Sequence, residues 1–234
     1  MAIASIATAD LSDIVFSVEA CLGGVCTGFF NVTQEDGTWD GDTFTWQLDG
    51  IVEITDEYGT VVGILGSDNP DEPTFVVFHN DPQVNLGFAM QAGSMDTTFT
   101  IRSALLEFDT ILNAQGQASV GVNVSDVMGD GATMVGAGPD DRVYLAQYNQ
   151  FVPNGTTFAT LIDGVTVTEP FDTVSVDDET GWQPITGAVD NMSSQIMLTL
   201  SAFDMASGTS NFEIIPEPAS LLMLVFGVAL ARRR

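Results

Sequence analysis

Apolar and polar residues alternate along most of the chain, which is the pattern of half-buried β-strands. The clearest stretch is 119–127, where Val120, Val122 and Val124 alternate with small or polar residues. The same reasoning predicts strands at 14–18, 43–48, 50–55, 74–79, 84–91, 97–108, 142–148, 156–162, 165–168, 195–203 and 209–215. Helical periodicity is rare between these segments. The pattern therefore predicts an all-β protein.

Turn signals separate the predicted strands. Tyr58-Gly59, Asn154-Gly155 and Asp163-Gly164 lie between apolar segments, and Asn-Gly and Asp-Gly are strong hairpin signals. Spacing of roughly 8–15 residues per strand is typical of a β-sandwich or jelly roll. No linker or repeat divides 10–213, so we expect one sandwich-like domain there. The Gly-rich stretch 127–141 is expected to be a long surface loop.

The segment 214–234 has a different composition from the rest of the chain. It contains a Pro-Glu-Pro motif, an apolar run and a terminal arginine cluster: Pro216, Glu217, Pro218, 219–231, Arg232, Arg233 and Arg234. The run is apolar on all sides, so we expect a short hydrophobic helix in lipid, with the arginines cytoplasmic and the body outside. At about 1.5 Å per residue it spans about 20 Å of a hydrocarbon core of about 30 Å. The alternative is a core helix with an exposed basic end.

The order of these three parts resembles the PEP-CTERM sorting signal of Gram-negative bacteria. The match covers only the C-terminal tail, and the apolar run is shorter than is usual for that family. The resemblance implies recognition by an exosortase, a membrane cysteine protease-transpeptidase, with cleavage near the motif. It also implies a link to exopolysaccharide or biofilm production. The expected location is an exported precursor anchored in the inner membrane, then the outer surface or extracellular matrix.

The N-terminal segment 1–9 agrees with export. Ala7, Thr8 and Ala9 fit the small-residue A-x-A cleavage site of a secretory signal peptide. A basic n-region is missing from this segment, so we interpret 1–9 as the remnant of a truncated signal peptide. The alternative is a disordered or strand-forming terminus.

The chain is strongly acidic. It contains no lysine, and Arg102 and Arg142 are the only basic residues before the tail. Setting aside 216–234, which holds three Arg and one Glu, changes the formal net charge from −27 to −29. Such a field repels nucleic acid, and it repels anionic polysaccharide unless divalent cations bridge the two. Nucleic-acid binding is therefore excluded. A hydrophobic content of 45% argues against disorder.

The only two cysteines, Cys21 and Cys26, lie close together in the sequence. In an oxidising compartment such a pair indicates a local disulfide, which stabilises by about 2 kcal/mol for so short a loop. Two free thiols are an alternative. A catalytic couple with His79, the only histidine, is another.

One acidic turn partly resembles a calcium-binding loop. Asp126 and Asp130 occupy ligand positions of the D-x-[DN]-x-D-G pattern, but Met128 stands where an oxygen ligand is expected. Asp140 and Asp141 lie close enough in sequence to complete a different cage. We therefore name these four aspartates as a candidate Ca²⁺ site, with a solvated acidic turn as the alternative. A second acidic cluster lies at 177–179, where we also expect an acidic turn.

The sequence contains no G-x-S-x-G or H-E-x-x-H motif. We therefore predict a non-enzymatic exported surface or matrix protein that needs no cofactor beyond a potential Ca²⁺ ion and binds carbohydrate or matrix partners. Exposed Trp39 or Trp182 could stack on sugars, whereas Trp46 lies in an alternating strand and is expected in the core. The alternative is a secreted glycosidase-like hydrolase with a carboxylate pair.

Overall fold

The computed structural model describes residues 10–151 and 153–217. The segment 1–9, Pro218, the apolar run 219–231 and the arginine cluster Arg232, Arg233 and Arg234 lie outside the described residues. The described chain folds almost entirely into strands, and each strand pairing is antiparallel. No helix within this part of the chain is long and apolar enough to cross a membrane.

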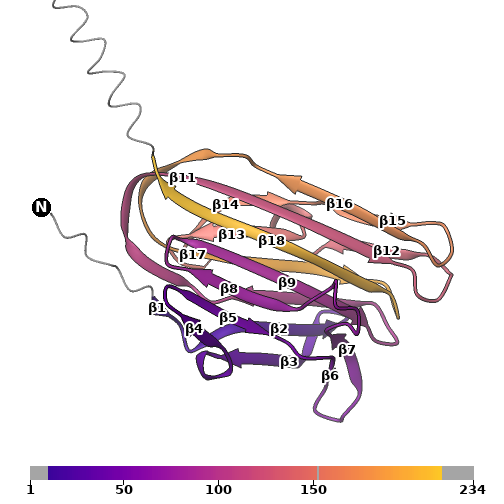
Figure 1. The fold of residues 1–234 in the computed structure, drawn as a ribbon. Coiled ribbons are helices and arrows are strands. Elements are labelled where there is room, and N and C mark those ends of the chain that lie inside the picture. The colour runs from indigo at the N-terminus through magenta and orange to yellow at the C-terminus, as the bar shows by residue number, and fades with distance from the viewer. Residues whose placement is uncertain (1–9, 152, 218–234) are drawn as a thin grey trace, which may run out of the picture.

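The first of two sheets carries seven strands side by side, which follow one another from top to bottom in Figure 1. In spatial order these are β16 (Thr173–Glu179), the second half of β11 (Leu106–Ser125), β18 (Met205–Pro216), β9 (Gln83–Ala92), β8 (Phe75–His79), β5 (Thr43–Gln47) and β4 (Thr38–Asp40). At the far end of β9, β7 (Val61–Leu65) pairs with β9, and β6 (Val52–Thr55) pairs with β7.

The second sheet is built around the long strand β17 (Gln183–Leu200). Its spatial order is β14 (Thr156–Leu161), β13 (Tyr144–Tyr148), β17, β10 (Thr97–Ser103), β2 (Ile14–Leu22) and β3 (Val25–Thr33). The end of β17 also pairs with β12 (Ala132–Gly136), which pairs with β15 (Gly164–Val167). The short β1 (Asp10–Leu11) pairs with the start of β11. Two 3-10 turns, η1 (Gln34–Asp36) and η2 (Pro139–Asp141), complete the described elements.

Strand β11 joins the two sheets. Its first half pairs with β17, and its second half lies between β16 and β18. The register with β17 shifts at two places, between Glu107 and Ile111 and between Leu112 and Ala114. Asn113, at the second shift, has a φ of 56°. Such bulges bend a strand, and in Figure 1 the long ribbon curves round at the left. The result is a β-sandwich in which one continuous strand passes from layer to layer.

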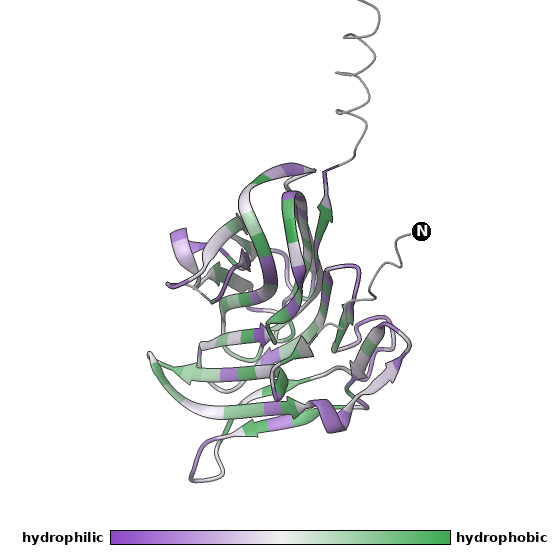
Figure 2. Ribbon diagram, turned by 90° about the vertical axis from the view of Figure 1, so that its left-hand side faces the viewer, coloured by the Kyte–Doolittle hydropathy of each residue, from purple (hydrophilic) through white to green (hydrophobic). Residues whose placement is uncertain are grey.

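The apolar faces of the two sheets form the core. Val120, Val122 and Val124 are buried, as their alternation predicts. The ring of the fully buried Phe212 stacks on that of Phe158, with centroids 5.0 Å apart. Trp46 is 8% exposed, which confirms its predicted place in the core. Green and purple segments alternate along many strands in Figure 2, as expected when one face is buried and the other solvated.

Three expectations about the elements are wrong. The stretch 127–141 is not a continuous loop, because β12 lies within it. The acidic cluster at 177–179 forms the end of β16 rather than a turn. The sheet also continues past the expected boundary at residue 213, since β18 includes the fully buried Ile214 and ends at Pro216.

Candidate functional site

The predicted disulfide is present in the structure. Cys21 and Cys26 are bonded across the β2–β3 hairpin, with their Cα atoms 3.8 Å apart. The turn between them contains Gly23 and Gly24, whose φ angles of 57° and 83° suit a two-residue hairpin turn. His79 lies instead in β8, where its Nδ1 is 3.1 Å from the hydroxyl of Thr43. A Cys–His couple is therefore not formed among the described residues.

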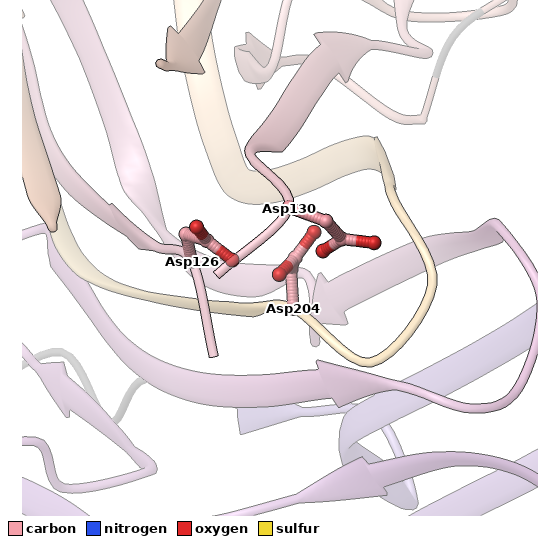
Figure 3. A group of neighbouring side chains, drawn as sticks. All are labelled: Asp126, Asp130 and Asp204. Atoms are coloured by element: carbon pink, nitrogen blue, oxygen red, sulfur yellow. The ribbon is translucent and has the colours of Figure 1, made fainter. Parts of the chain in front are cut away.

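Two of the four predicted metal-site aspartates lie together with a third that the sequence did not suggest. Carboxylate oxygens of Asp126, Asp130 and Asp204 lie within 4.8 Å of one another, and the three groups point toward one another in Figure 3. Asp204 comes from the loop between β17 and β18. Asp140 and Asp141 do not join this cluster; they lie exposed in η2 with φ angles of 58° and 56°. The structure therefore does not bring these two aspartates together with Asp126 and Asp130.

Asp126 closes its own turn through backbone donors. Its carboxylate accepts N–H groups from Gly129 (2.7 Å), Gly131 (3.0 Å) and Phe171 (3.1 Å). Burial acts to raise the pKa of Asp126, but these N–H groups and that of Asp130 together outweigh it and hold the pKa below its usual value. The carboxylate thus occupies a nest of donors that stabilises its charged form.

The pKa of Asp204 is shifted in the opposite direction from that of Asp126. Its side chain is 1% exposed, and it accepts hydrogen bonds from the Ser201 hydroxyl and, at 3.2 Å, from the backbone N–H of Val127. Burial raises the pKa of Asp204, and repulsion from Asp126 and Asp130 adds to the rise, against the effect of its two donors. Because the buried carboxylates are satisfied by protein donors, the cluster ties the turn after β11 to the loop before β18.

The outer face of the first sheet carries a groove. Residues Phe75, Gly87, Thr209, Gly121 and Asp177 stand opposite one another on β8, β9, β18, β11 and β16, so they form one row across five strands. The ring of Phe75 lies over Gly87, and nothing lies within 4 Å of the place where a side chain at Gly121 would begin. The ring of Phe75 thus fills the space above Gly87, while Gly121 leaves an open trough between Thr209 and Asp177.

The neighbouring row supplies polar walls to this five-strand groove. Asn85, Asn211 and Ser119 stand opposite one another on β9, β18 and β11, and they line a hollow of about 470 Å³ together with the row of Phe75. A second hollow of about 300 Å³ shares Gly121 and Thr209 with the first. The groove therefore continues along β11 and β18 toward the β7–β8 loop, which contributes Asp71, Glu72 and Pro73 to the second hollow.

The β7–β8 loop closes that end of the groove. Glu72, in this loop, accepts hydrogen bonds from the hydroxyls of Ser67 (3.0 Å) and Ser207 (3.2 Å). The expected sugar-stacking tryptophans do not line the groove: Trp39 is 43% exposed and packs against Phe44, and Trp182 is 45% exposed. The aromatic ring of the groove is Phe75, which sequence alone did not distinguish from core residues.

Comparisons with known proteins do not identify a family. No protein-family model matches the chain, and no curated protein sequence matches it significantly. Among solved structures it is similar to the enzymatically active domain of bacteriophage CBA120 tailspike protein 4, with 12% identity, a TM-score of 0.30, and coverage of 75% of this chain but 20% of that chain. It is also similar to a CBM4 structure, with 14% identity, a TM-score of 0.25, and coverage of 56% of this chain and 84% of that chain. A family 16 carbohydrate-binding module matches with 11% identity, a TM-score of 0.24, and coverage of 56% of this chain and 76% of that chain. Likenesses this weak support neither a fold assignment nor a function.

Proposed function

We propose that this chain is an exported surface or extracellular-matrix protein that an exosortase sorts and processes through its C-terminal tail. The observation that carries the proposal is the order of parts in the sequence: the Pro-Glu-Pro motif 216–218, the apolar run 219–231 and the arginine cluster 232–234. In this proposal the tail anchors the precursor in the inner membrane and is cut near the motif. The body then reaches the outer surface or matrix.

The position of the motif relative to the folded body supports this proposal. Pro216 is the last residue of β18 and stands opposite Ala114, and the N–H of Glu217 donates to the carbonyl of Asn113 at 2.7 Å. The motif thus begins at the rim of the sandwich with no linker before it. A precursor anchored by its tail would hold its folded body close to the membrane surface.

The disulfide supports an extracytoplasmic location for the body. The bond between Cys21 and Cys26 belongs to an oxidising compartment, since cytosolic thiols are kept reduced. The acidic charge adds to this support, because a formal charge of −29 on residues 1–215 favours a soluble protein that does not bind nucleic acid.

The intact mass of the protein from its host, with and without the candidate exosortase gene, tests the proposal. The expected result is loss of the residues from about Pro216 onward only in the strain that has the exosortase. An uncut C-terminus in both strains would overturn it. Because a mass difference locates the cut to single residues, the same spectra show whether the N-terminal segment 1–9 is also removed.

We further propose a non-enzymatic role for the body, as a partner of exopolysaccharide in the matrix. A glycosidase needs two carboxyl groups on either side of the bond it cuts. Asp177 is the single carboxylate among the described residues around the 470 Å³ hollow, and of the two carboxylates around the adjoining 300 Å³ hollow, Asp71 and Glu72, the second already accepts hydrogen bonds from Ser67 and Ser207. Incubation with polysaccharide and measurement of new reducing ends tests this point. Release of reducing ends above that of heat-inactivated protein would favour the hydrolase alternative.

A further inference from the structure

We propose that the five-strand groove binds a linear, uncharged polysaccharide chain. This inference rests on the proposed matrix role and assigns that role a site and a ligand class. The site is the row Phe75, Gly87, Thr209, Gly121 and Asp177.

The shape of the groove suits an extended chain. Five adjacent strands give four inter-strand spacings, so the row is roughly 19 Å long, enough for several sugar units. Its two adjoining hollows of about 470 and 300 Å³ lie within or near the range of ligand sites. Because Gly121 adds no side chain to the row, the floor of the trough is open between Thr209 and Asp177.

The groups along the groove match the chemistry of sugars. The half-buried ring of Phe75 lines the hollow, and an aromatic ring offers apolar surface for the C–H face of a pyranose. The amides of Asn85 and Asn211 offer both donors and acceptors, and the hydroxyls of Ser119 and Thr209 do the same. Hydroxyl groups on a sugar ring require this mixture, since each one donates and accepts.

Charge selects against acidic polysaccharides. Among the described residues the basic side chains are already paired, Arg102 with Glu19 at 3.2 Å and Arg142 with Asp163 at 3.0 Å, and neither lines the groove. Asp177 at one end of the row would repel a uronate or sulfate. Asp71 and Glu72 line the 300 Å³ hollow beside the row and add to this repulsion. Uncharged groups that suit a neutral chain line the 470 Å³ hollow: Asn85, Asn211, Ser119 and Thr209.

Affinity gel electrophoresis and calorimetry of the protein purified from its host would test the proposal. The probes are neutral hexasaccharides of β-1,4-glucose and α-1,4-glucose, dextran, alginate as a polyuronate and chitosan as a polyamine. We expect at least one neutral probe to bind with an affinity that changes little with salt, and alginate to bind at least tenfold more weakly. Binding by no neutral probe, or only by chitosan in a salt-sensitive way, would overturn the proposal.

Variants locate the site. Phe75→Ala should weaken binding of the neutral probe at least tenfold, whereas Phe29→Ala, which removes a 58% exposed ring from β3 in the other sheet, should leave it unchanged. If Phe75→Ala does not fold, Gly121→Thr, which blocks the trough from its floor, provides the same test. Equal binding by wild type and a folded groove variant would contradict the site. Failure here concerns the groove only, because the sorting proposal is judged from the mass of the C-terminus.

Discussion

Replacing Gly121 with threonine is expected to stabilise the protein while it abolishes glycan binding. Gly121 lies in the interior of β11, its backbone is outside the left-handed region, and a Cβ added there would meet no atom within 4 Å. The new side chain would stand on the groove side between Thr209 and Asp177. It would therefore fill the trough without touching the core.

The size of the stabilisation follows from the local structure. A glycine within a strand costs about 0.5–1 kcal/mol relative to alanine, and β-branched residues lie at the favourable end of a propensity scale of about 1 kcal/mol. A cross-strand pair with Thr209 adds about 0.2–1 kcal/mol. The sum is about 1–2 kcal/mol, which for a domain of this size raises Tm by about 2–8 °C.

Two measurements on the same sample of the Gly121→Thr variant test its stability and its binding. Thermal unfolding followed by circular dichroism gives Tm, and calorimetry gives the affinity for the neutral probe. Ser125→Thr is the matched control, since it lies on the same face of β11 but outside the lining of the two hollows; it should bind as wild type does. A Gly121→Thr variant that binds normally would refute the groove, and one that melts earlier would refute the packing argument.

Three further predictions concern stability. Phe212→Ala removes a fully buried ring, so it should cost about 3–5 kcal/mol and lower Tm by about 6–20 °C; a drop of only a degree or two would show that the core is not built as described. Replacing both Cys21 and Cys26 with serine should cost about 2 kcal/mol, and reductant should lower the Tm of wild type but not of the variant. Burial in the folded protein raises the pKa of Asp204 above its value in the unfolded chain, so the folded protein holds the proton of this carboxyl group more tightly. The free energy of unfolding of the wild type therefore falls as pH rises from about 3.9, the ordinary pKa of aspartate, through the raised pKa. The Asp204→Asn variant should not show this loss of stability, so its Tm should rise relative to that of the wild type between acidic and neutral pH. Measurement of Tm from pH 3 to 8 checks this, and parallel Tm profiles of the two proteins would contradict it.

Strict alternation identified the strands that bury one face, and it failed where burial does not follow the alternation. The Val120, Val122 and Val124 series was found because one side of β11 faces the core along its second half. Strand β3 was missed because Phe29 is exposed while Gly28 is buried. In β16 the alternation of valines ends in acidic residues, which resemble a turn when read without their partner strand.

The sites depend on register and on contacts between distant segments, which one sequence does not specify. Asp126 and Asp130 were found because they lie in one turn. Asp204 was not, because β17 and β18 bring its loop back to that turn. The groove was missed for the same reason: Gly87 and Gly121 share a row only through β18, which pairs with the strands of both.

The alternation that forms the core also makes the groove independent of it. On β11 the side chains of Val120 and Val122 enter the core, while Ser119 and Gly121 face the groove. Successive side chains of a strand point to opposite faces, so a substitution on the groove face changes the ligand surface without changing core volume. Large-to-small changes on the core face open cavities at a cost of a few kcal/mol. A sandwich of this kind can therefore vary the surface of its groove while its two sheets remain packed.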